Sequence, residues 1–95
     1  MSAGYSLAIA PAAVTDIRDA FQWYDERNAL AADGFRAQVF ETTDRIADNP
    51  LGKAADSNGN RRRVLHRFPY TVVYELVANS TTILATAHHR REPGC

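Results

Sequence analysis

The sequence is poor in the features that disulfides, membrane spans and secretion require. Cys95 is its one cysteine, so an internal disulfide is excluded. No apolar run approaches the roughly 20 residues that cross a bilayer. The N-terminal segment Met1–Tyr5 lacks the basic flank and apolar core of a secretion signal. From these absences we expect a cytoplasmic protein with no membrane partner.

Elements that hold cofactors or carry out covalent catalysis are also missing. The sequence has no Gly-Lys-Ser or Gly-Lys-Thr phosphate-binding element, and nothing suggests a Ser-His-Asp or Cys-His arrangement. His66, His88 and His89 lack ligand spacing with cysteine or carboxylate, and adjacent histidines on a strand point to opposite faces. We therefore expect no cofactor, no metal ion and no small-molecule substrate.

What the sequence does contain is typical of an ordinary globular domain. Its 95 residues are 45% hydrophobic and 23% charged, and a chain of this length buries roughly two-thirds of its unfolded surface. It has no internal repeats or low-complexity tracts. We predict a single domain that spans residues 1–95.

The net charge of zero hides a division between two parts of the chain. Residues 1–60 carry nine acidic and five basic groups, and residues 61–95 carry two acidic and six basic groups, so −4 is followed by +4. The basic part suggests an anionic partner, either nucleic acid or an acidic peptide. A set of solvated arginines at strand ends would produce the same pattern.

Three consecutive strands are predicted in the basic part. Segments 62–67, 70–77 and 81–89 are rich in Val, Ile, Thr and Tyr, with breaks at Phe68-Pro69 and at 78–80. Connections this short predict an antiparallel meander. One face of the middle strand is entirely apolar or aromatic and is expected to be covered by another layer. Its members are Tyr70, Val72, Tyr74 and Leu76.

A further strand and a first helix are predicted ahead of this meander. Residues 5–10 alternate in part and are expected to join the same sheet. Pro11 opens a helix that runs to about Arg27. Asp16 and Asp19 are placed to suit the positive end of its dipole. Residues at helical spacing form its apolar stripe: Val14, Ile17, Phe21 and Tyr24.

A second helix is predicted from about Leu30 to Asp48. Its inner stripe consists of Phe35, Val39, Thr42 and Ile46. Gly34 is expected to allow close approach of the first helix. Trp23 and Phe40, off the main stripes, either pack at the edge of the core or mark a protein interface. Residues 51–60 show no periodicity and are expected to form a flexible loop.

Together these elements predict an α+β fold in the order β-α-α-β-β-β. The short link between the helices makes them an antiparallel hairpin, and their apolar stripes require a partner layer. We expect the hairpin to cover the apolar face of a small, mainly antiparallel sheet.

Two segments form distinctive motifs: the strand Phe68-Pro69-Tyr70-Thr71-Val72-Val73-Tyr74 and the ending His88-His89-Arg90-Arg91-Glu92-Pro93-Gly94. They resemble the RelE/ParE superfamily of type II toxin–antitoxin (plasmid-stabilisation) modules. The resemblance covers nearly the whole chain. The helical segments that also match are Phe21–Tyr24, Gly34–Arg36 and Ile46–Pro50.

Thr71 separates the two functional branches of this superfamily. RelE-like members, which cleave mRNA in the ribosome, resemble each other in an arginine just after the aromatic residue that opens the middle strand. Here Thr71 takes that position, and a neutral hydroxyl cannot replace a permanent charge beside a phosphate. The resemblance is therefore closer to the ParE branch. It implies a toxin that poisons DNA gyrase without chemistry of its own and is neutralised by a ParD-like antitoxin.

The basic residues are the expected contacts with these partners. A small sheet with a free edge and basic borders accepts an extended acidic-apolar peptide by strand addition. The positions expected to bind antitoxin or target are Arg61, Arg62, Arg63, Arg67, Arg90 and Arg91.

Two alternatives remain open. One is a RelE-like, ribosome-dependent mRNA endonuclease with a rearranged active site, and the other is an inactive member of the superfamily. The residues available to the endonuclease are Arg62, Arg67, His88, His89 and Arg91.

Overall fold

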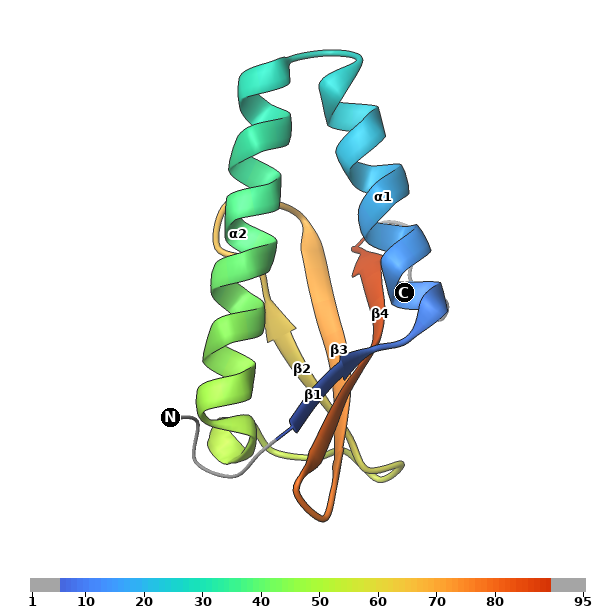
Figure 1. Cartoon of the computed structure of the whole chain (residues 1–95), viewed down its shortest axis with the longest axis vertical. Coiled ribbons are helices and arrows are strands. Elements are labelled where there is room, and N and C mark those ends of the chain that lie inside the picture. The colour runs from blue at the N-terminus through green and yellow to red at the C-terminus, as the bar shows by residue number, and fades with distance from the viewer. Residues whose placement is uncertain (1–5, 90–95) are drawn as a thin grey trace.

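The computed structural model describes residues 6–89, in which one strand is followed by two helices and three strands (Figure 1). The elements are β1 (Ser6–Ile9), α1 (Pro11–Asp25), α2 (Ala29–Asp48), the short 3₁₀ helix η1 (Pro50–Gly52), β2 (Asn60–Val64), β3 (Tyr70–Val77) and β4 (Ser80–His88). This order confirms the predicted α+β class. Tyr5, Arg90, Arg91 and Cys95, which enter the predictions above, lie outside the described residues.

The four strands form one sheet in the order β1-β4-β3-β2. The β2–β3 and β3–β4 pairs are antiparallel, as the short connections predicted. β1 joins the same sheet, but it pairs in parallel with β4, with Leu7 opposite Thr81. A parallel pair requires a long connection between its strands, and here both helices and the β2–β3 hairpin form it. β1 and β2 therefore lie at the two edges of the sheet.

The helical hairpin covers one face of the sheet (Figure 1). The α2 stripe is confirmed, because Phe35, Val39, Thr42 and Ile46 are all buried. Asn28 begins this helix as its N-cap: its side-chain oxygen accepts from the Leu30 amide at 2.9 Å. No helix within residues 6–89 has the length and apolar character needed to cross a membrane.

The predicted stripe of α1 is partly wrong. Ile17, Phe21 and Tyr24 do pack against the core, but Val14 is 40% exposed. The fully covered positions are Ala13 and Ala20. These two alanines are two helical turns apart, so they mark the line of closest contact, and the larger side chains reach the core from beside it.

Gly34 does not serve the role predicted for it. The neighbour of a side chain built there would be the Phe68 ring, whose Cζ would lie 3.5 Å from the new Cβ, and not the first helix. Phe68 belongs to an aromatic cluster that also includes Tyr24, Phe35 and Tyr70, with ring centroids 5.2 Å apart for Phe35–Tyr70 and 5.5 Å for Phe35–Phe68. Trp23 packs its ring edge-to-face on Tyr24 at 5.1 Å and is partly exposed.

Asp16 also differs from its prediction, because its carboxylate serves the sheet and not the helix dipole. Val73 lies opposite Ala85 and Tyr74 lies opposite Ile83, so Leu84 is an extra residue that bulges β4. Two residues further on, the backbone N–H of Thr86 donates to Asp16 Oδ2 at 3.0 Å. The sequence indicated no such partner, since Asp16 and Thr86 are 70 positions apart.

The largest shift of a predicted strand boundary is in β2. β2 covers Asn60–Val64 and not 62–67, because the chain turns immediately afterwards: the Leu65 N–H donates to the Tyr70 carbonyl at 2.9 Å. The loop before β2 is also more ordered than predicted, since it contains η1 and a hydrogen-bonded turn at Asp56–Gly59.

Candidate protein-binding surface along strand β2

The three consecutive arginines of β2 point in two directions. Arg61 lies opposite Tyr74 and Arg63 lies opposite Val72, both of which are core residues, so Arg61 and Arg63 share the helix-facing side. Arg62 lies opposite Val73, on the other side of the sheet. The three arginine side chains are therefore divided between the two sides of the edge strand and do not form one basic patch.

The two helix-facing arginines lie beside a buried tyrosine. The Arg61 guanidinium donates to the Lys53 carbonyl, which ties β2 to the loop before it. The Tyr74 hydroxyl donates to the Pro50 carbonyl at 3.1 Å in a buried contact. Burial raises the pKa of Tyr74 above its ordinary value of 10.0, and the positive charges of Arg61 and Arg63 offset part of that effect. On the helix-facing side, these two contacts hold the start of β2 and the neighbouring part of β3 to the segment that follows α2.

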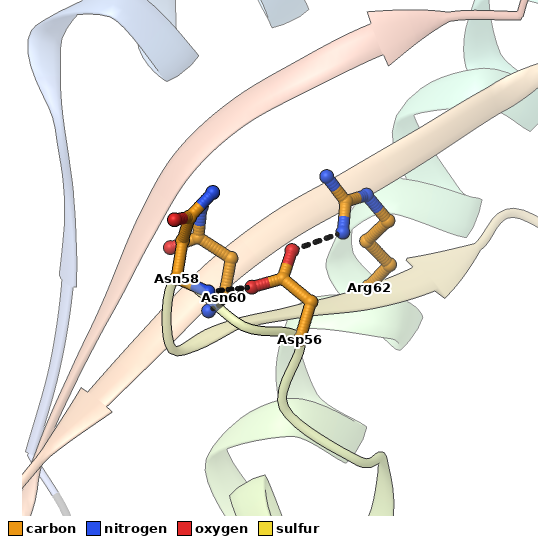
Figure 2. A network of polar contacts seen from close by, with 4 residues as sticks. All are labelled: Asp56, Asn58, Asn60 and Arg62. Carbon is orange, nitrogen blue, oxygen red and sulfur yellow. Dashed lines mark hydrogen bonds and ion pairs between the residues drawn. The ribbon is translucent and has the colours of Figure 1, made fainter.

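Arg62 is held by Asp56, which is the centre of a small polar network (Figure 2). Arg62 Nη1 lies 2.7 Å from Asp56 Oδ2. The other carboxylate oxygen, Oδ1, accepts from the Asn58 amide at 2.8 Å and from the Asn60 amide at 3.0 Å. The hydrogen bond from Arg62, followed by those from the Asn60 and Asn58 amides, holds the pKa of Asp56 below its ordinary value of 3.8.

Backbone geometry supports this network. The Asp56 N–H donates to the Asn60 carbonyl at 2.8 Å, and Gly59 has a φ of +82°, a conformation that residues with a side chain rarely adopt. Asp56 was missed as a site residue in the sequence analysis. The sequence Asp56-Ser57-Asn58-Gly59 was the available signal, because aspartate accepting from an amide two residues later is typical of turns.

The edge of β2 has a defined outward-facing part. The Leu65 N–H donates to the Tyr70 carbonyl, so Leu65 and Tyr70 form a hydrogen-bonded pair. In an antiparallel ladder, hydrogen-bonded and non-hydrogen-bonded residue pairs alternate. Arg61 and Arg63 therefore direct their backbone N–H and C=O groups toward β3. Asn60, Arg62 and Val64 direct theirs away from it. Asp56 engages both backbone groups of Asn60. Beyond the strand, the His66 N–H donates to Gln38 Oε1 at 3.2 Å.

A groove runs beside this edge, between α2 and β2. Residues from α2, the loop and β2 line it: Gln38, Glu41, Thr42, Arg45, Lys53, Arg62, Arg63, Val64 and His66. Four of them are Lys or Arg and one, Glu41, is acidic; Glu41 pairs with Arg45 at 3.0 Å. The groove lining therefore carries net positive charge next to the outward-facing backbone of β2.

The arginines expected to bind partners are only partly brought together. Arg61, Arg62 and Arg63 all lie on β2, and Arg62 and Arg63 line the groove. Arg67 is exposed in the connection between β2 and β3. Arg90 and Arg91 lie outside the described residues.

The alternative catalytic residues are divided between the two sides of the sheet. His88 lies opposite Tyr70, with ring centroids 4.9 Å apart, on the helix-facing side. His89 instead reaches Thr71, and its Nε2 lies 2.9 Å from the Thr71 hydroxyl. The prediction that the adjacent histidines point to opposite faces is confirmed. Among residues 6–89, no group of three or more His, Cys, Asp or Glu side chains could hold a metal ion.

Thr71 occupies the position at which RelE-like, RNA-cleaving members have an arginine. It is 6% exposed, and it lies within the sheet opposite Val64 and Ala87. Its hydroxyl is engaged by His89. The position therefore offers a covered, neutral hydroxyl in place of a cation.

Comparison with known proteins gives a family and a fold. The family described as "ParE toxin of type II toxin-antitoxin system, parDE" matches residues 7–93. Among solved structures, the chain is similar to one from the chromosomal ParDE TA system of P. aeruginosa, at 17% sequence identity and a TM-score of 0.77. That match covers 88% of this chain and 95% of the other, and at this identity it shows the fold. No curated protein sequence matches the chain.

Proposed function

Since this chain belongs to the ParE toxin family of type II toxin–antitoxin systems, we propose that it acts by binding and poisoning DNA gyrase. In this proposal the toxin breaks no bond itself: it traps the gyrase complex in which DNA is cleaved. A ParD-like antitoxin neutralises it by binding its basic surface. Gyrase as the target places the protein in the bacterial cytoplasm.

The observation that carries the non-enzymatic proposal is the environment of Thr71. Cleavage of RNA develops negative charge on the phosphate and on the leaving oxygen, and enzymes place fixed donors or cations there. Thr71 is covered and hydrogen-bonded to His89, so it adds no charge to the sheet surface. His88 is directed to the helix-facing side, away from the side on which His89 meets Thr71.

Two incubations test this proposal. The first combines the purified toxin with gyrase, ATP and supercoiled plasmid, and the expected product is cleaved DNA that accumulates with toxin concentration. The second combines the toxin with translating ribosomes, and the message is expected to remain intact. Codon-spaced cuts in the message that disappear in His89→Gln would overturn the proposal in favour of an mRNA endonuclease.

The antitoxin contact is proposed to rest on Arg61, Arg62, Arg63, Arg67, Arg90 and Arg91. The positive groove beside β2 supports this choice, because it suits an acidic segment. The test is the double charge reversal Arg63→Glu with Arg67→Glu, which is expected to weaken binding of the cognate antitoxin at least tenfold.

The matched control reverses two exposed helical arginines, Arg18→Glu with Arg36→Glu, and changes the net charge by the same amount. Antitoxin binding is expected to weaken much less in this control. Equal loss of binding in the two double variants would show that overall charge, and not the β2 region, sets the affinity.

A further inference from the structure

We infer that Asp56 is an internal competitor: it occupies Arg62 in the free toxin and is replaced there by a carboxylate of an extended acidic partner segment that binds along the β2 edge. This inference rests on the proposed toxin–antitoxin function, and it assigns a chemistry and a place to the partner segment.

The edge geometry decides where the segment lies. β2 is an edge strand of the sheet, and Arg62 and Val64 direct their backbone groups away from β3. Val64 is 62% exposed, although it is apolar. An added strand would pair with this backbone and cover the Val64 side chain. The outward-facing backbone groups of Asn60 are already engaged by Asp56, so the added strand begins at Arg62.

The charge of the groove decides the chemistry of the segment. Lys53, Arg62 and Arg63 belong to the loop and strand that border it, and Arg45, which is paired with Glu41, belongs to α2. Successive side chains of an added strand point to opposite faces, so one set lies beside Arg63 and the groove and the other lies beside Arg62 and Val64. The matching segment therefore has carboxylates on the groove side and, on the other side, a carboxylate at Arg62 and an apolar residue two positions away at Val64.

The Asp56–Arg62 pair already has the geometry of such a contact. The 2.7 Å separation of Arg62 Nη1 and Asp56 Oδ2 is that of a charge-assisted hydrogen bond. Both side chains retain substantial exposure, 46% for Arg62 and 31% for Asp56. An exposed pair contributes little to folding, so Arg62 can exchange one carboxylate for another at little cost while Oδ1 of Asp56 continues to hold the turn.

The test uses the whole toxin and the synthetic peptide acetyl-Val-Glu-Glu-Glu-Val-Glu-amide, whose first, third and fifth residues give one face Val, Glu and Val while the other face is all Glu. Binding is followed by amide NMR shifts. Asp56→Asn removes the charge but keeps an oxygen that can accept from the Asn58 and Asn60 amides. It is expected to tighten peptide binding about two- to fivefold, the size of one exposed ion pair. Asp44→Asn, on an exposed position of α2, is the control with the same change of net charge.

Arg62→Gln completes a double-mutant cycle. In the Arg62→Gln background, Asp56→Asn is expected to have no more effect than Asp44→Asn. The Val64 amide, which points outward, is expected to shift more than the inward amide of Arg63. Replacing Glu by Gln in the peptide is expected to remove the gain.

Three results would overturn the inference: equal affinities for Asp56→Asn and Asp44→Asn, a gain that persists without Arg62, or peptide shifts confined to another surface. These measurements involve neither gyrase nor antitoxin. Failure of the gyrase assay with a positive peptide result would therefore discard the target and keep the edge site, and the reverse outcome would discard only the edge site.

Discussion

The helix-facing side of the sheet and its β2 edge are held by contacts of opposite character, although they are built from neighbouring residues. Tyr74, on the covered side, is fully buried and donates to the Pro50 carbonyl. Arg62 follows Arg61, which lies opposite Tyr74. The Arg62 side chain is exposed and pairs with Asp56. Both contacts tie the sheet to the segment between α2 and β2. Burial makes the first one part of the stability of the fold, and exposure leaves the second one exchangeable.

This difference separates the contacts that stabilise the domain from those at its β2 edge. Apolar residues of α1, α2 and the sheet are concentrated on the covered side, where they form the core cluster. The charged residues of β2 contribute to the border of that side and to the groove beside it. Changes on the covered side should therefore alter unfolding, and changes on the edge should alter binding.

The largest expected effect is on the covered side. Phe35 is fully buried within the aromatic cluster, and Phe35→Ala should lower the free energy of unfolding by about 3–5 kcal/mol through lost burial and the cavity left behind. Phe40→Ala, at a residue that is 58% exposed, is the matched control and should change it by no more than about 0.5 kcal/mol. Urea unfolding measures both. A similar cost for the two variants would contradict the assignment of the core.

The next effect concerns the bulge in β4. Asp16→Ala leaves the Thr86 amide without its carboxylate acceptor, so the free energy of unfolding should fall by about 1–3 kcal/mol. Asp16→Asn, which retains an oxygen acceptor, should recover most of the loss. Asp19→Ala, at an exposed position of the same helix, should be near neutral. Equal thermal unfolding midpoints for Asp16→Ala and Asp19→Ala would show that the contact does not stabilise the bulge.

A smaller effect is expected for the buried tyrosine. Tyr74→Phe keeps the ring and removes the hydroxyl that donates to Pro50, and it should cost about 1 kcal/mol, or roughly 4–8 °C in the unfolding midpoint. Affinity for the acidic peptide should not change, because the hydroxyl lies on the covered side. If Tyr74→Phe also weakened peptide binding, the covered side and the β2 edge would not be independent.

The smallest effect is a pH dependence confined to the edge. The pKa of Asp56 is lowered below 3.8, first by Arg62 and then by the Asn60 and Asn58 amides. Stabilisation by a carboxyl of this kind is present above its unfolded pKa and is lost as the pH falls through the folded pKa. The Asn58 and Asn60 amide signals should therefore titrate with a midpoint below 3.8 and become flat in Asp56→Asn. A midpoint above 3.8 would show that the network does not form in solution.

Predictions from the sequence succeeded where the pattern is local. The 3.6-residue period identified the buried stripe of α2, and the alternation in β3 identified Tyr70, Val72 and Tyr74 as core residues. Leu76, the fourth residue predicted for that face of β3, is only partly buried. The short breaks between the last three strands predicted their antiparallel pairing. Resemblance of the Phe68–Tyr74 strand and of the ending to a toxin superfamily agreed with the ParE family match.

Predictions failed, or could not be made, where the contact partner is distant in sequence. The apolar spacing of α1 suggested Val14, yet Ala13 and Ala20 lie at the contact, because the crossing of helix and sheet selects the side that approaches most closely. Gly34 faces Phe68 for the same kind of reason. The Asp56 network was within reach of sequence analysis, since its turn is local, but its ion pair with Arg62 depends on where β2 begins.

Local sequence patterns suffice for the type and order of the elements and for the buried side of α2 and β3, because each depends on residues within a few positions of one another. The unequal distribution of charge is also read directly from the sequence. Three other features are visible only in the folded chain: β1 pairs with β4, Asp16 supports the β4 bulge, and the arginines of β2 border a groove with α2. Those features depend on how the helical hairpin packs on the sheet, which brings together side chains whose separation in sequence carries no periodic signal.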